Sequence, residues 1–207
     1  MKRIAVLLTG LSIGTAQPLF AQIPTTPPGA PDASRVAAGN YTVDPAHSQV
    51  AFTVNHLGFS MYRGLFGDVT GAMTLDPKAP AAAKVSIDIP ISGITTTSAQ
   101  LNEHLQGADF FDAAKYPKAH FESTKIEASG NKAKIIGNLT IKGVTKPVVL
   151  DAHFIGAGTM MGKQTIGFEA KTTVKRSDFG VSYGIPLVPD EVPLDISVAF
   201  ERPAAAK

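Results

Sequence analysis

The most constraining feature of the sequence is a strict alternation of apolar with polar or small residues in the segment 47–66. Val50, Phe52 and Val54 share one parity with His56, and the residues between them are polar or small. A period of two is typical of a β-strand with one apolar face. That face must be covered, so the segment predicts a strand that has partners.

A second alternating run, residues 66–75, follows after the short connection LGFSMYRG. It predicts an antiparallel neighbour that shares the same apolar face. His56, Tyr62 and Arg63 would then gather at the end where the two strands join.

The same pattern returns at regular intervals along the rest of the chain, as expected of an antiparallel meander rather than of βαβ units. About eight one-sided strands result, and closure into a barrel buries every apolar face without leaving an edge. We therefore predict an all-β fold, an eight-stranded antiparallel barrel with one or two short helices. Such a barrel either fills its interior or holds one small ligand. The further strands are expected at residues 85–89, 120–127, 134–142, 146–155, 166–174 and 194–200.

One short helix interrupts the strands at residues 97–106. Thr97 and Gln100 resemble a capping box, and Gly107 is placed as a C-terminal stop. The aromatic-rich residues 107–117 predict an apolar loop that folds over one end of the sheet.

The two ends of the chain are expected to lie outside the barrel. Residues 1–21 carry a basic start, an apolar run and a small residue before Gln22, which predicts a cleaved signal peptide. Residues 22–39 are proline-rich and predict an extended, mobile linker, so the barrel would span residues 40–203 with a tail at 204–207. Export without any cysteine suits the periplasm.

The charge balance gives no support for a nucleic-acid partner. The chain has 19 basic and 17 acidic residues, and two of the basic residues, Lys2 and Arg3, belong to the predicted signal peptide. The mature chain would be neutral, and it contains no basic cluster.

No catalytic or metal-binding constellation is evident. The one G-x-S-x-G pattern, residues 10–14, lies in the predicted signal peptide. The five histidines show neither the i, i+4 spacing of a helix nor the i, i+2 spacing of a strand that would place two ligands together. We expect no catalytic residue, no metal and no cofactor.

Three polar residues are candidates for contacts with a ligand head group. The parity of His56 directs it to the apolar face, where it is either a hydrogen-bonded core histidine or a polar anchor at one end of a cavity. Arg63 and Arg176 carry guanidinium groups that match the geometry of a phosphate. For the cluster around Arg176 and Asp178, an Arg–Asp pair with a turn is the alternative interpretation.

Five blocks follow one another in the sequence: DPAHSQVAFTVNHLG, YRGLFGDVTG, LNEHLQGADFFDAAKYPKAHFES, GNLTIKGVTKPVVL and KRSDFG. In this order they resemble the YceI-like polyisoprenoid-binding family of secreted bacterial proteins. The resemblance runs from about Tyr41 to Arg202, and Ala108 stands where the family usually has Glu. It implies a lipocalin-like barrel with an internal hydrophobic tunnel for a long isoprenoid or similar amphiphile, and no cofactor.

The leading hypothesis from the sequence is a periplasmic carrier or store for a polyisoprenoid, such as an isoprenoid quinone or a polyprenyl phosphate. A packed structural or partner-binding barrel and an enzyme acting on such a lipid are the alternatives, and a transient membrane contact and a homodimer are left open. His56, Arg63 and Arg176 are the predicted head-group contacts. The predicted tail contacts are Phe52, Val54, Phe66, Ile87, Leu101, Leu105, Phe121, Leu139, Phe168 and Ile196.

Overall fold

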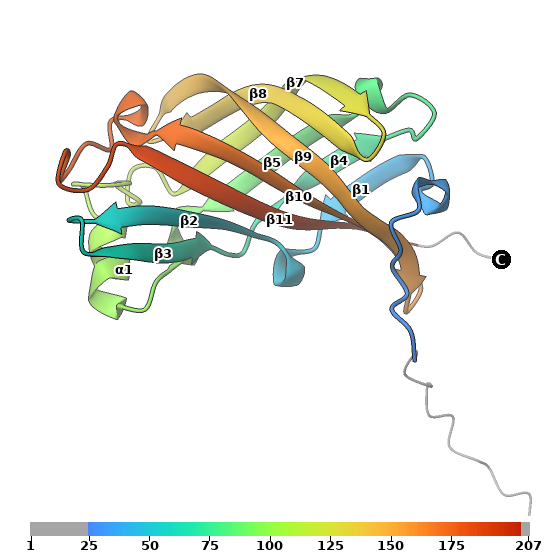
Figure 1. Ribbon diagram of the computed structural model, residues 1–207, viewed down its shortest axis with the longest axis horizontal. Coiled ribbons are helices and arrows are strands. Elements are labelled where there is room, and N and C mark those ends of the chain that lie inside the picture. The colour runs from blue at the N-terminus through green and yellow to red at the C-terminus, as the bar shows by residue number, and fades with distance from the viewer. Residues whose placement is uncertain (1–24, 204–207) are drawn as a thin grey trace, which may run out of the picture.

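The structure, a computed structural model, describes residues 25–203 and is a closed antiparallel β-barrel with one α-helix (Figure 1). The predicted signal peptide, residues 1–21, and the predicted tail, residues 204–207, lie outside the described residues. No helix in residues 25–203 is long and apolar enough to cross a membrane.

Eight strands form the closed ring, in the order β1-β4-β5-β7-β8-β9-β10-β11, and β11 pairs back with β1. The predicted barrel is therefore confirmed. The bounds of these strands are β1 Gly39–Val43, β4 Thr70–Leu75, β5 Lys84–Pro90, β7 Lys118–Ser129, β8 Lys132–Ile141, β9 Val144–Met160, β10 Lys163–Lys175 and β11 Glu191–Pro203.

Three more strands extend the ring beside the first half of β11. These are β2 Gln49–His56, β3 Ser60–Phe66 and β6 Ile94–Thr95. Strand β2 pairs with β11 through Phe52 and Leu194, β3 pairs with β2, and β6 pairs with β3. Together with the helix α1, Ala99–Gln106, they surround one end of the barrel (Figure 1).

The predicted partner of β2 was wrong. Residues 60–64, expected to belong to a connection, are part of the antiparallel neighbour β3, whereas residues 70–75 form β4, which pairs with β1 and β5. The cause is local: Leu57 and Gly58 both adopt positive φ, 57° and 78°, so the chain reverses tightly right after β2. A second break at Asp68, with φ 55°, separates β3 from β4.

The predicted helix exists, with a different cap. The side chain of Ser98, not Thr97, accepts a hydrogen bond from the N–H of Leu101 at 3.2 Å. The side chain of Asn102 accepts hydrogen bonds from the N–H and the hydroxyl of Thr96, at 2.8 and 2.7 Å. These bonds hold the start of α1 against the end of the barrel.

Part of the predicted linker lies against the barrel wall. Ala30 exchanges two backbone hydrogen bonds with Ala157 of β9, at 3.1 and 2.9 Å, and Ala33–Arg35 forms a 3-10 turn. The hydroxyl of the buried Tyr41 donates to the carbonyl of Ala37, at 2.6 Å. This part of the segment is therefore not a free spacer.

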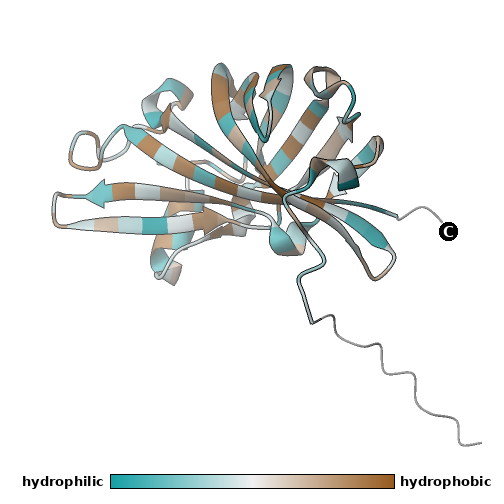
Figure 2. Ribbon diagram, turned by 45° about the vertical axis from the view of Figure 1, so that its right-hand side comes forward, coloured by the Kyte–Doolittle hydropathy of each residue, from teal (hydrophilic) through white to brown (hydrophobic). Residues whose placement is uncertain are grey.

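Polar and apolar residues alternate along the strands of the ring (Figure 2). The apolar parity faces the lumen, where two clusters of buried side chains form around Ile166 and Phe200 and around Phe121 and Phe179. The two clusters share partly buried neighbours, among them Phe52 and Leu194. The barrel therefore has an apolar interior along most of its length.

Candidate functional site

The interior of the barrel is hollow. It contains an inner compartment of about 280 Å³ and an outer compartment of about 580 Å³. Both volumes fall near the range of small-molecule sites, about 300 to 1,000 Å³. Four residues line both compartments and mark the boundary between them, called the neck: Val50, Ile89, Leu139 and Leu194.

The inner compartment is lined by strands from all sides of the ring. Ile87, Phe121, Phe168 and Ile196 lie on its wall, together with Leu139 of the neck. Phe168 packs edge-on against Phe154 and Phe200, with ring centroids 5.8 and 6.2 Å apart. Ala33 and Val36, from the segment that precedes β1, line the same compartment.

The outer compartment lies under α1 and the β2–β3 hairpin. It is lined by Phe52 and Val54 from β2, Phe66 from β3, and Leu101 and Leu105 from α1. The structure thus places all ten predicted tail contacts on the wall of the cavity. Their role in binding remains a proposal, argued below.

The open end of the outer compartment carries polar groups. His56, Ser60 and Tyr62 of the β2–β3 hairpin line it. The Tyr62 hydroxyl lies 3.1 Å from the hydroxyl of Thr97, which connects the hairpin to the start of α1. His56 is the one predicted head-group residue that both lines the cavity and keeps the polar atoms of its side chain available, because its imidazole has no hydrogen bond or ion pair among residues 25–203.

A cluster of three rings closes part of this mouth. His104 of α1, Phe110 of the following loop and Tyr183 lie with their ring centroids 5.0 to 5.3 Å apart. Aromatic pairs at this spacing contribute about 0.5 to 1.5 kcal/mol each beyond their burial. The cluster joins α1 to the loop between β10 and β11 across the opening.

Arg176 lines the outer compartment, and most of its guanidinium is bonded to the rim. Its guanidinium donates four hydrogen bonds to backbone carbonyls, of Pro189 at 2.9 Å, Val181 at 2.9 Å, Tyr183 at 2.8 Å and Val188 at 2.8 Å. A guanidinium has five N–H groups, so one is left. Arg176 therefore holds residues 181–189 in place at the rim of the outer compartment, which it also lines, and one N–H is left for a ligand.

The environment of Arg176 supports this interpretation. Burial lowers the pKa of Arg176 below its usual value, and the carboxylate of Asp190 opposes that effect. Asp190 itself accepts hydrogen bonds from the N–H and the hydroxyl of Ser177, at 2.8 and 2.7 Å. The Ser177 hydroxyl, followed by its N–H, lowers the pKa of the Asp190 carboxyl. The loop between β10 and β11 is thus hydrogen-bonded near both of its ends to the 3-10 turn Arg176–Phe179.

Arg63 lies outside the cavity. It pairs in register with Thr53, whereas Tyr62 pairs with Val54 of the lumen face, so Arg63 has the outward parity. Its side chain is exposed and lines neither compartment. The sequence-based prediction failed because it put Arg63 in a connection, where parity has no meaning, while the residue belongs to a strand.

Sequence analysis missed the polar residues Ser60, His104 and Tyr183 at the mouth. Ser60 has the same parity as Tyr62, which would have been visible if residues 60–66 had been assigned to a strand. Tyr183 lies in a loop without any periodic signal. In the described part of the chain, no group of three His, Asp or Glu residues is arranged to hold a metal ion.

The sequence and the fold match known proteins over nearly the whole barrel. The model of the YceI-like domain matches residues 41–200. This chain belongs to the YceI-like family. It is 41% identical to Protein YceI of Escherichia coli O157:H7 over 169 residues, which cover 80% of this chain and 88% of the relative.

Solved structures of the YceI-like family and of more distant proteins share the barrel. BcnA of Burkholderia cenocepacia is 29% identical, with a TM-score of 0.66 over 76% of this chain and 98% of BcnA. A polyisoprenoid binding domain from Saccharophagus degradans, implicated in plant cell wall breakdown, has a TM-score of 0.62 over 79% of this chain and 98% of that domain. At 16% identity, the second likeness concerns the fold alone.

Proposed function

We propose that this protein binds a polyisoprenoid or a similar long-chain amphiphile in its barrel and holds or carries it in the periplasm. The observation that carries the proposal is the two-compartment cavity, whose wall is apolar from Leu101 at the outer end to Phe168 at the inner end. Membership of the YceI-like family supports it, and the Saccharophagus degradans barrel is described as polyisoprenoid-binding.

The cavity suits a flexible hydrocarbon tail. Burial from water stabilises a tail by about 0.8 kcal/mol per CH₂, so a few isoprene units suffice for tight binding relative to water. A bilayer shelters the same tail equally well, and the net gain on extraction from a membrane is therefore small. Selectivity must come from the shape of the cavity and from the polar groups at its mouth.

The mouth favours an uncharged head group over a phosphate. Among the described residues, the two predicted cations do not offer a phosphate site, because Arg63 faces outward and Arg176 is bonded to four carbonyls. His56, Ser60 and Tyr62 can each donate or accept hydrogen bonds. A quinone carbonyl or a prenol hydroxyl is matched by these groups.

Native mass spectrometry of protein purified without detergent tests the proposal. We expect a co-purified or added prenyl lipid to remain bound, and an uncharged prenol to reach higher occupancy than the prenyl phosphate of the same length. Protein that takes up neither lipid would refute the carrier function and favour a barrel with a purely structural role. Preferential uptake of the phosphate would refute the head-group argument alone.

A further inference from the structure

We propose that the mouth of the barrel docks on a lipid bilayer, with the tip of the β2–β3 hairpin, residues 57–61, inserted among the lipids as the anchor. The inference rests on the proposed lipid-binding function, because a ligand that is sheltered in a membrane must pass between bilayer and cavity. It assigns that passage to one face of the molecule.

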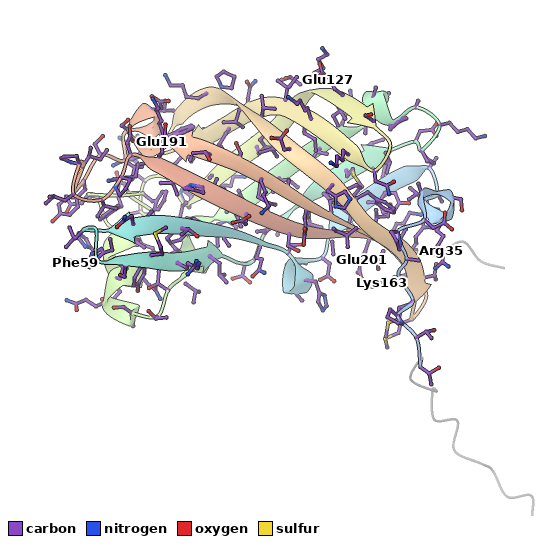
Figure 3. All side chains as sticks on the ribbon, in the orientation of Figure 1. Arg35, Phe59, Glu127, Lys163, Glu191 and Glu201 are labelled. Atoms are coloured by element: carbon purple, nitrogen blue, oxygen red, sulfur yellow. The ribbon has the colours of Figure 1, made fainter. Side chains whose placement is uncertain are left out.

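Large apolar side chains are exposed around this mouth. Phe59 is 88% exposed, and Leu57 and Met61 on the same hairpin are also exposed. Leu187, 68% exposed, and Tyr183 lie on the loop that Arg176 holds on another side of the opening. Figure 3 shows Phe59 at the extreme end of the barrel.

The hairpin tip is rigid and uncharged, as an inserting element requires. The side chain of Asn55 accepts a hydrogen bond from the N–H of Gly58 at 2.9 Å, and the carbonyl of His56 accepts one from Phe59 at 3.0 Å. A preorganised turn loses little conformational freedom when it inserts. Residues 57–62 contain no ionisable group except the phenol of Tyr62.

Arg63 gives the surface its charge complementarity. It is exposed and lies on the outward face of β3, two residues after Met61 of the hairpin tip. At that place a long basic side chain can reach lipid phosphates while the tip lies among the acyl chains. Arg63, which lies outside the cavity, is thus placed to contact the surface of the membrane.

The cavity indicates which partner this surface fits. His56 and Ser60 on the hairpin and Tyr183 on the loop line the outer compartment, so the apolar rim is continuous with its wall. The opposite end of the barrel carries ion pairs beside its exposed Met160 and Met161, Lys163 with Glu201 at 2.6 Å and Arg35 with Asp32 at 3.6 Å, and these methionines line neither compartment (Figure 3).

The exposed apolar area favours a bilayer over a second copy of the chain. With about 200 Å² for a large side chain, the exposed parts of the five apolar residues at the mouth amount to about 600 Å². These residues are Leu57, Phe59, Met61, Tyr183 and Leu187. A stable protein interface buries about 800 Å² on each partner and is closely complementary in shape. A narrow hairpin tip inserts into a fluid bilayer without such complementarity.

Vesicle sedimentation with a matched pair of variants tests the proposal. Phe59→Glu places a charge at the tip, whereas Met161→Glu makes the same change at a residue that is 90% exposed on the β9–β10 turn, at the other end of the barrel. On vesicles of phosphatidylethanolamine and phosphatidylglycerol, we expect at least about a tenfold loss of binding for Phe59→Glu and no loss for Met161→Glu. Equal binding of both variants, or an equal loss, would overturn the proposal.

Two further readouts separate this proposal from its alternatives. The chain contains no tryptophan, so Phe59→Trp introduces a single reporter whose emission should shift to the blue and be quenched by brominated lipids. Arg63→Gln should bind these anionic vesicles more weakly than the wild type, and the difference in binding between the two proteins should vanish at high salt. A wild-type dimer that Phe59→Glu dissociates, without vesicle binding by the wild type, would instead identify the surface as a protein interface.

The proposed function is tested separately by uptake from solution. Phe59 lines neither compartment, so Phe59→Glu should bind a ten-carbon prenol added without vesicles as the wild type does. Normal uptake with normal vesicle binding would refute the docking surface and leave the carrier function intact. Absence of uptake by the wild type would refute the carrier function.

Discussion

The neck between the two compartments offers the sharpest test of the cavity. Leu194 lines both compartments, lies opposite Phe52 of β2 and Thr172 of β10, and packs against both clusters of buried side chains. Leu194→Phe should narrow the neck and keep a long tail out of the inner compartment. Leu194→Met conserves volume and serves as the control.

The expected magnitude follows from the two volumes. If each carbon group takes about 30 Å³, which is the share of one water molecule in the liquid, ten carbons fill about 300 Å³ and thirty carbons about 900 Å³. The outer compartment, about 580 Å³, accepts the shorter chain, whereas the longer chain needs both compartments. Excluding one five-carbon unit costs up to about 4 kcal/mol, and only a third of that is a tenfold loss in affinity.

A competition experiment measures this loss without depending on the solubility of the ligand. Wild type and variant are mixed in equal amounts with a limiting prenol, and native mass spectrometry gives the ratio of their occupancies. For Leu194→Phe we expect the wild type to be favoured at least about tenfold for the thirty-carbon prenol, and equal occupancy for the ten-carbon prenol. Leu194→Met should give equal occupancy for both. A ratio that does not depend on chain length would refute the argument that the inner compartment holds the tail.

Three more predictions concern the lumen and the rim. Phe168→Asp should place an unpaired charge between Phe154 and Phe200 and lower the free energy of unfolding by more than about 3 kcal/mol, measured by urea denaturation. Phe168→Leu should keep prenol uptake, and equal stability of the two variants would contradict the buried, apolar position. Arg176→Met should remove four hydrogen bonds and destabilise the rim by at least about 1.5 kcal/mol, which is the contribution of one hydrogen bond from a charged group. Hydrogen exchange in residues 181–189 should become faster, and unchanged exchange would show that Arg176 does not hold the loop. Because the pKa of Asp190 is lowered in the folded protein, the contribution of Asp190 to stability is fully present above about pH 4, the ordinary pKa of an aspartate, and is lost as the pH falls through the lowered pKa. Hydrogen exchange near Ser177, corrected for the intrinsic rate, should therefore accelerate in acid for the wild type and be independent of pH for Asp190→Asn.

The outcome for individual residues shows how far local patterning reaches. Parity along a strand is a property of the backbone over a few residues, so it placed Phe52, Val54 and Phe168 on the lumen side correctly. Bulges interrupt the register between Ser123 and Lys125 and between Gly167 and Phe168, and no predicted tail contact is displaced from the lumen by them.

The two arginines show where local patterning ends. Arg63 and Arg176 have the same side chain and were assigned the same role, but one faces outward from a strand and the other is bonded to carbonyls up to 13 residues away. A guanidinium binds whichever acceptors the fold brings near it, and those acceptors have no periodic signal in the sequence.

The sequence by itself determined that the chain is built from one-sided strands, that they close into a barrel, and which side chains of the expected strands face its interior. These properties follow from alternation at a period of two and from the need to cover every apolar face. Only the tertiary structure decided that β3 rather than β4 pairs with β2, that the lumen is divided at a neck, and that a loop between β10 and β11 meets α1 at the mouth. Each of these depends on contacts between segments far apart in the chain, and their geometry is set by the closure of the whole sheet.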